Sequence, residues 1–194
     1  MRVHVVHAHP VETSFNRSLF TTVVDTLRAR GHEVDACSLY DEGFDAVLSR
    51  EERIHYEDVP GNLTPAVKPY VDRLRAAEAI VFVHPVWNYG YPAILKGYFD
   101  RIFLPGVSFE LRDGGAQPAL ANIKRAAFVT TYGGTWWRTY LMGDPPRRVA
   151  RRWGWATFRT RQAPQYLALY DMNNNKEPQL KAYLEKVRAE FSRW

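Results

Sequence analysis

Cysteine is almost absent from this sequence: Cys37 is the only one among 194 residues. A single thiol cannot form a disulfide within the chain, and it excludes a zinc site built from several cysteines. A lone cysteine usually behaves as a small buried apolar side chain. We therefore expect a buried thiol at Cys37 and no metal site.

Long hydrophobic runs and an export signal are also missing. No apolar run approaches the roughly 20 residues of a membrane-spanning helix. The chain opens on the strand-like residues 3–7 in place of a basic and apolar leader. We expect a cytoplasmic protein without a transmembrane segment. Its 46% hydrophobic and 24% charged residues are ordinary for a globular chain, and we expect residues 1–194 to form a single domain.

Two common nucleotide-binding patterns are absent. The sequence has no Gly-x-x-x-x-Gly-Lys-Ser/Thr loop, and no Gly-x-Gly-x-x-Gly follows the first strand-like segment. Neither a P-loop NTPase nor a standard dinucleotide-binding domain is supported. The net charge is +5, but a cluster of arginines is confined to one region and does not interleave with aromatic residues along the chain, so we expect no nucleic-acid partner. The clustered residues are Arg147, Arg148, Arg151, Arg152, Arg159 and Arg161.

Strand-like and helical segments alternate along the chain. The strand-like segments are residues 3–7, 32–38, 80–83, 125–130 and 166–170. The helical segments are residues 14–30, 64–77, 92–103, a stretch within 145–153, and 176–191. This alternation predicts an α/β protein with a doubly wound, five-stranded parallel sheet of flavodoxin-like order 2-1-3-4-5, with helices on both faces. We expect the irregular stretches 40–63 and 105–124 to be excursions near a site or a subunit interface.

Residues 80–103 are the most informative segment. An apolar strand ends at His84-Pro85, an aromatic loop follows, and Pro92 stands where the first turn of a helix tolerates proline. In open α/β sheets, ligands bind at the carboxyl ends of the strands. The loop is therefore expected to receive a flat, partly polar ligand. Its candidate residues are Val86, Trp87, Asn88 and Tyr89.

The first predicted strand is followed by a loop with polar side chains at the start of a helix. Thr13, Ser14 and Asn16 stand beside the free backbone N–H groups of that helix start, which suits a phosphate. His9 could add a charge or a hydrogen bond. Alternatively, Thr13 or Ser14 simply caps the helix.

The fourth predicted strand ends in Thr130 and Thr131, followed after one residue by Gly133 and Gly134. Two glycines allow a ligand to approach the backbone closely, although such a pair taken alone is more often a turn. The first, third and fourth strands are adjacent in the predicted sheet, so one ligand can touch all three loops. A phosphate at the first loop and a flat heteroaromatic ring between the other two describe a flavin.

At these residues the sequence resembles the NAD(P)H:quinone oxidoreductase family of flavodoxin-like flavoproteins. The resemblance covers most of the chain, and it is specific only as a combination of His9 with residues 13–16, residues 38–40, residues 92–103, and the threonine and glycine pairs. It implies that His9, Phe15 and Asn16 hold the flavin phosphate or pyrophosphate. It also implies that residues 86–89 line the isoalloxazine ring, and that the threonine and glycine pairs face its pyrimidine side.

The sequence departs from the family after the glycine pair. Where mammalian members have a tyrosine and a histidine, this chain has Trp136 and Met142, so that proton relay does not carry over. Trp136 suggests an altered pocket wall, and Arg138 or Tyr140 could polarise an acceptor instead. These three are the candidate catalytic residues. Alternatively Trp136 and its neighbour Trp137 are packing residues, one of them in the core.

The resemblance implies ping-pong chemistry, in which NAD(P)H passes a hydride to the flavin N5 and a quinone or similar flat acceptor then takes it. We favour FAD, because residues 13–16 follow the FAD-binding members closely, and FMN is the alternative. Family members are usually homodimers. The expected apolar face, which core packing explains equally well, comprises Tyr98, Phe99, Phe103, Phe109 and Trp153.

Other functions remain open at this point. Azo-dye, nitroaromatic or free-flavin reduction could replace quinone reduction, because one stacking pocket accepts many flat acceptors. The chain could also be a regulatory oxidoreductase subunit of a potassium-efflux channel, or an electron carrier, although such carriers are typically acidic. The clustered arginines could meet the 2′-phosphate of NADPH, or they form a solvated basic helix face.

Overall fold

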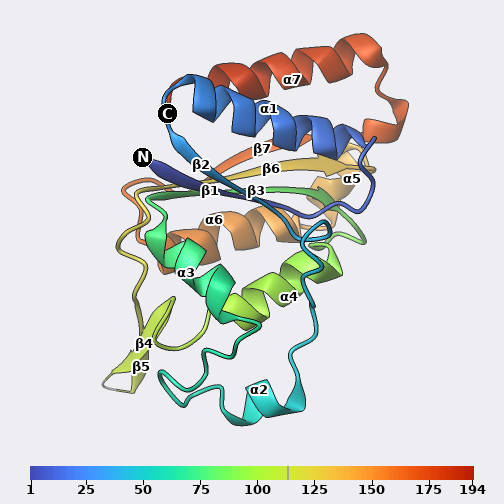
Figure 1. Cartoon of the computed structure of the whole chain (residues 1–194). Helices are drawn as coiled ribbons and strands as arrows, with labels where there is room; N and C mark the ends of the chain where they lie inside the picture. Colours follow the sequence, from blue (N-terminus) through green and yellow to red (C-terminus); the bar gives the residue numbers. More distant parts are fainter. Residues whose placement is uncertain (113) are drawn as a thin grey trace.

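The computed structural model describes residues 1–112 and 114–194. Its main sheet has five parallel strands in the order β2-β1-β3-β6-β7 (Figure 1). The strands are β1 (Arg2–His7), β2 (Glu33–Ser38), β3 (Ala79–Val86), β6 (Arg125–Tyr132) and β7 (Gln165–Leu169). The predicted doubly wound sheet with order 2-1-3-4-5 is confirmed, since β4 and β5 form a separate two-stranded sheet.

Helices cover both faces of this sheet. α1 (Phe15–Ala29) and α7 (Glu177–Phe191) lie above it in Figure 1, and α3 (Lys68–Ala76), α4 (Ala93–Ile102) and α6 (Pro145–Phe158) lie below. Successive strand residues point to opposite faces. In β3, Val81 and Val83 therefore join the apolar layer under α1 and α7, whereas Ile80 and Phe82 join the other layer.

β3 runs further than the sequence predicted. We expected it to end at His84-Pro85, but it continues to Val86, with His84 opposite Thr130 and Pro85 opposite Thr131. The carbonyl of Val83 accepts from the N–H of Ala8, so the backbone N–H and C=O of Val83 face the β1 side. Alternate residues of a strand face the same neighbour, so the backbone of Pro85 faces that side too. Since β1 ends at His7, no partner strand needs the N–H that proline lacks.

Secondary structure also occurs in the stretches expected to be irregular. α2 (Arg50–Ile54) lies in the first, and the β4 (Phe109–Arg112) and β5 (Gly115–Pro118) hairpin lies in the second. The short helix α5 (Trp136–Leu141) was not predicted, because only Thr139 of its residues is buried and no amphipathic pattern marks it. A single 3-10 turn, η1 (Met172–Asn174), precedes α7.

The aromatic face expected at a subunit interface lies mostly in the core. Tyr98, Phe99 and Phe103 of α4 and its end are buried, and the ring of Trp153 packs 5.0 Å from Phe99 and 5.2 Å from Phe103. Phe109 is half-buried. Packing of α6 on α4 therefore accounts for Phe99, Phe103 and Trp153 within one chain.

Two further sequence expectations bear on the molecule as a whole. The Cys37 side chain is buried and unpaired, as expected, and burial raises the pKa of its thiol well above the usual value. Among the residues that the structure describes, no helix is long and apolar enough to cross a bilayer.

A segment after β2 packs directly on α4. Arg101 of α4 donates to the carbonyl of Asp45 and forms a 2.6 Å ion pair with Glu52, and both side chains of this pair are almost fully buried. A Cβ added at Gly97 would lie 2.1 Å from the carbonyl oxygen of Ala46. The absence of a side chain at Gly97 is what allows this backbone to lie against the helix.

We predict that Gly97→Ala destabilises the protein by about 3 kcal/mol, because a backbone carbonyl cannot move away as a flexible side chain can. The measurement is the free energy of unfolding in urea. The neighbouring exposed variant Lys96→Ala is the matched control and should change it by less than about 1 kcal/mol. Equal effects of the two variants would contradict this contact.

Candidate active site

Three loops meet at the carboxyl ends of β1, β3 and β6. They comprise residues 8–14, 87–92 and 133–135. The ring centroids of His9 and Trp87 are 5.8 Å apart, which joins the first loop to the second. A Cβ placed on Gly134 would lie 3.9 Å from the hydroxyl oxygen of Tyr89, which joins the second loop to the third. The structure thus brings together the three loops that the sequence singled out.

The first loop ends in a capped helix that still offers free donors. Ser14 is the N-cap of α1, and its Oγ accepts from the N–H of Arg17 at 3.1 Å, so the capping alternative holds for Ser14. Thr13 is exposed. The N–H groups of Phe15 and Asn16 have no acceptor among the described residues. They are available to an anion.

Asn16 and His9 add side-chain donors to this helix start. Asn16 is 2% exposed, and within the described residues neither its amide oxygen nor its nitrogen has a partner. Such a buried unpaired group costs about 1–3 kcal/mol, which a ligand can relieve. The Nδ1 of His9 accepts from the N–H of Val11, and burial lowers the pKa of His9. His9 therefore offers an N–H at Nε2 rather than a charge.

The second loop is a tight turn with a strained backbone. Trp87 and Gly90 exchange backbone hydrogen bonds of 3.2 and 2.8 Å, and Asn88 and Tyr89 between them have φ of 49° and 57°. The left-handed conformation costs a bulky residue such as Tyr89 about 1–2 kcal/mol. Strain of this kind is retained where the backbone is held for function. Trp87 is 42% exposed beside this turn.

The third loop has room where a side chain would normally stand. Thr130 and Thr131 are buried in β6, and the Oγ1 of Thr130 has no partner among the described residues. A Cβ added at Gly133 or Gly134 would meet nothing closer than 3.5 and 3.7 Å, respectively. A Cβ would therefore fit at either glycine in ordinary van der Waals contact, and Gly133 is exposed.

The predicted catalytic residues lie on α5, directly after this loop. Trp136 is 66% exposed and Tyr140 is exposed as well, while the Arg138 guanidinium lies 5.1 Å from the Trp137 ring. Both tryptophans are exposed, so the alternative that one packs in the core is wrong. In the part of the chain that is described, these side chains make no hydrogen bond, ion pair or ring contact with the first two loops.

Sequence reasoning missed His84, which lies beneath the second loop. Its Nδ1–H donates to the carbonyl of Pro85 at 2.9 Å, and its ring packs edge-on against Tyr91 at 5.1 Å. Complete burial lowers the pKa of His84 to about 4, so the ring is neutral at pH 7. Its position directly before the proline at a strand end was the only indication in the sequence.

A tyrosine cluster around Asp144 was also missed. Tyr132 donates to one carboxylate oxygen of Asp144 at 2.7 Å, Tyr170 donates to the other at 3.3 Å, and the hydroxyls of Tyr132 and Tyr166 are 2.5 Å apart. Burial raises the pKa of Tyr132 well above its usual range. Tyr132 therefore ties the end of β6, directly before the third loop, to the start of α6. No local pattern reveals these pairs.

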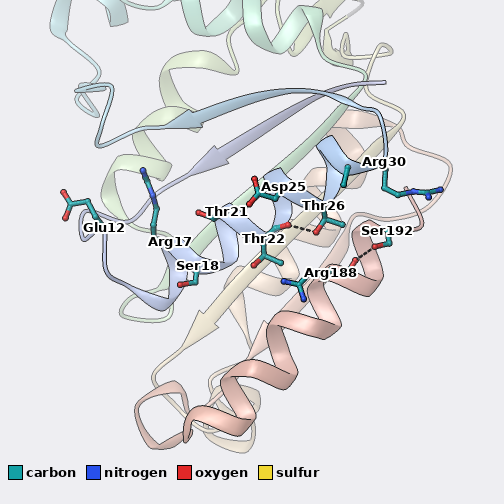
Figure 2. Close-up of a pocket in the computed structure, with 11 residues that line it drawn as sticks. Glu12, Arg17, Ser18, Thr21, Thr22, Asp25, Thr26, Arg30, Arg188 and Ser192 are labelled. Carbon is teal, nitrogen blue, oxygen red and sulfur yellow. Dashed lines mark hydrogen bonds between the residues drawn. The ribbon is translucent and has the colours of Figure 1, made fainter.

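A separate groove of about 690 Å³ runs along α1 and α7 (Figure 2). Its walls are polar helix surface, including Thr22, Asp25 and Arg188. Most of it lies along the helices rather than at the ends of β3 and β6, so we do not place the site there. Among the described residues, no group of three or more His, Cys, Asp or Glu side chains is arranged to hold a metal ion.

A parallel sheet of this order with ligand-suited loops at its carboxyl edge defines a flavodoxin-like protein. A family model described as a flavodoxin-like fold matches residues 1–191, and the chain belongs to this family.

The chain is similar to a sequence relative and to two solved structures. It is 29% identical over 149 residues to the NAD(P)H dehydrogenase [quinone] 1 of Rattus norvegicus, which covers 68% of this chain but only 54% of that relative. The NAD(P)H:quinone oxidoreductase from Methanothermobacter marburgensis superposes with a TM-score of 0.85 at 24% identity, covering 99% and 96% of the two chains. An FMN-dependent NADH-azoreductase from Bacillus anthracis, in complex with FMN, gives 0.76 at 17% identity, covering 99% and 98%.

We predict that His84 makes the stability depend on pH. The unfolded histidine, with its ordinary pKa near 6.5, binds a proton before the buried one does, so the free energy of unfolding falls as the pH drops from about 6.5 towards 4. Between about pH 7.5 and pH 5, the free energy of unfolding of His84→Phe should therefore fall by about 2 kcal/mol less than that of the wild type. Urea unfolding of the wild type and of His84→Phe at both pH values measures it. An unchanged loss in His84→Phe would contradict the burial of a neutral ring.

Proposed function

We propose that this protein is a flavin-dependent NAD(P)H:quinone oxidoreductase. The observation that carries the proposal is the meeting of the three loops, through the His9 and Trp87 rings and through Gly134 and Tyr89. The similarity to the rat NAD(P)H dehydrogenase [quinone] 1 supports the activity. Overall, NAD(P)H gives a hydride and water gives a proton, and a quinone accepts both to become a hydroquinone.

The residues fit a flavin at this edge of the sheet. The phosphate would be held at the start of α1, where the N–H groups of Phe15 and Asn16 are free and the Asn16 amide is unpaired. The other candidates there are His9, Thr13 and Ser14. A bound flavin supplies two-electron hydride chemistry that side chains cannot perform.

The remaining two loops would hold and shield the ring. The left-handed turn fixes the N–H groups of Asn88 and Tyr89, while Val86 and Trp87 provide an apolar wall. On the other side, Thr130 and Thr131 precede the open backbone of Gly133 and Gly134. Backbone donors held in place stabilise negative charge without the reorganisation that water requires.

We assign the handling of the acceptor to α5. The Arg138 guanidinium would polarise the acceptor oxygen, while the Tyr140 hydroxyl is a hydrogen-bond donor. Trp136 would form a wall for a flat acceptor. All three side chains are exposed and therefore accessible to a molecule arriving from outside.

Several finer points belong to the same proposal. We favour FAD, on the pattern of residues 13–16, with FMN as the alternative, and either NADH or NADPH as the donor. We also propose one domain over residues 1–194, a cytoplasmic location and a homodimer. Azo-compound reduction is a second candidate activity, because the chain superposes on an FMN-dependent NADH-azoreductase from Bacillus anthracis with a TM-score of 0.76.

The first test is an absorbance spectrum of the purified protein with the heat-released cofactor identified by mass. Flavin bands should bleach with NADPH without oxygen and return when a soluble benzoquinone is added. The mass distinguishes FAD from FMN. Failure to bind either flavin would overturn the proposed site, and a bound flavin that NAD(P)H cannot reduce would overturn the activity.

A second prediction tests the third loop. Gly134→Val should fold normally, because a Cβ there meets nothing closer than 3.7 Å, but it should weaken flavin binding about tenfold or more by filling the space of the ring. Gly115→Val in the β4–β5 hairpin is the control and should bind normally. Flavin fluorescence titration measures both, and equal affinities would remove Gly134 from the site.

A further inference from the structure

Charge is strongly segregated along this chain. Residues 114–170 contain nine lysines and arginines and one acidic residue, Asp144, whereas the rest of the chain contains 17 basic and 20 acidic residues. The carboxylate of Asp144 already accepts hydrogen bonds from Tyr132 and Tyr170. The excess positive charge therefore belongs to one part of the fold, which includes α5 and α6.

Four of these arginines lie on the outer surface of α6. Arg147, Arg148, Arg151 and Arg152 line one groove of about 670 Å³ together with Trp155. None of the four forms an ion pair with a carboxylate in residues 1–112 or 114–194. Some arginines elsewhere are paired, as Arg73 is with Asp35 and Glu42, and others, such as Arg28, form no ion pair among the described residues, but only α6 gathers four unpaired arginines in one groove. The Arg147 guanidinium lies 5.4 Å from the Tyr166 ring, and the charges of Arg148, Arg151 and Arg152 are left for an external partner.

Large apolar side chains continue this surface onto α5. Leu141 is 73% exposed and Met142 and Trp155 are more than half exposed. The two helices are joined through Gly143, where an added Cβ would lie 3.6 Å from the Arg148 guanidinium. We call the combined surface the docking face. It comprises Trp136, Trp137, Tyr140 and Leu141 of α5, the C-cap Met142 after it, and Arg147, Arg148, Arg151, Arg152 and Trp155 of α6.

We propose that the docking face binds the surface of an anionic lipid bilayer. Unpaired arginines attract anionic headgroups, and tryptophans favour the boundary between headgroups and hydrocarbon. Exposed Leu141 and Met142 favour lipid over nucleic acid or a free phosphate, since aliphatic side chains gain little from either of those but gain from acyl chains. The chain thus needs no membrane-spanning helix to reach a bilayer.

This surface begins two residues after Gly134, at the edge of the proposed active site. Resting on the proposed function, the acceptor class is then a lipid-soluble quinone taken from the bilayer. Arg138 and Tyr140 lie between the third loop and α6 in the chain, and both side chains are exposed to an acceptor arriving from the headgroup region. Docking shortens the route of an acceptor that is poorly soluble in water.

The test is flotation of the holoprotein with vesicles of phosphatidylglycerol and phosphatidylcholine in equal amounts, compared with pure phosphatidylcholine. We expect binding to the anionic vesicles and not to the neutral ones, and weaker binding when salt is raised from about 0.1 M to about 0.5 M. No binding, or equal binding to the two kinds of vesicle, overturns the proposal.

Variants separate the charge from the apolar contribution. The double variant Arg151→Glu and Arg152→Glu should lower the partition coefficient by about 30-fold or more, since each arginine near an anionic surface contributes about fivefold. Trp155→Ala with Leu141→Ala should lower it by about tenfold. The matched control is Arg28→Glu with Lys186→Glu on the opposite α1–α7 layer, where both side chains are exposed. A control that weakens binding as much as the first variant overturns the proposal.

Two other occupants of the docking face give different results. If a second copy of the chain covers it, the variants shift the mass measured by light scattering and leave vesicle binding unchanged. If it binds NADPH, the arginine variant raises the KM for NADPH more than that for NADH, again with unchanged vesicle binding. Either result overturns bilayer docking.

Activity measurements separate this inference from the proposed function. With NADH and a soluble benzoquinone, the arginine variant should keep the wild-type rate. With a long-chain quinone embedded in anionic vesicles, its rate should fall in parallel with vesicle binding. An equal rate with the embedded quinone overturns the acceptor assignment. Absence of any quinone reduction would overturn the proposed function, while flotation would still decide the docking.

Discussion

Every residue of β3, from Ala79 to Val86, is buried between two helical layers, and this burial organises the molecule. A parallel strand covered on both faces needs helices on each side, and the crossover connections that supply them return the chain to the same end of the sheet. The loops after β1, β3 and β6 consequently meet at one edge. The ring contact between His9 and Trp87 is a direct result of that topology.

The same edge collects the features that reduce stability. The left-handed Asn88 and Tyr89, the unpaired amide of Asn16 and the unpaired hydroxyl of Thr130 all lie there, whereas the two apolar layers are filled by interlocking side chains. A well-packed core can support such local costs because burial of the remaining sheet exceeds them. Strain and unpaired donors therefore mark the candidate site more clearly than any cavity does.

Charge follows the fold in a comparable way. α6 packs inward through Trp153 against α4 and turns its arginines outward, and α5 leaves nearly all its side chains exposed. The surface whose side chains are least buried in the core is thus the surface that is cationic and aromatic. Its position next to Gly134 connects a surface property of the molecule with the chemistry proposed at the strand ends.

The alternating periodicities of the sequence determined the order of strands, the helices on both faces and the three loops, because apolar spacing reports local burial. Only the tertiary structure decided the rest. The extension of β3 through Pro85 depends on where β1 stops, and the burial of Phe99 and Phe103 depends on α6 packing against α4. The pairing of Tyr132 with Asp144 joins residues whose proximity no spacing rule implies. A sequence pattern predicts that a side chain is buried, but the residue that it contacts depends on which chain segments fold beside it.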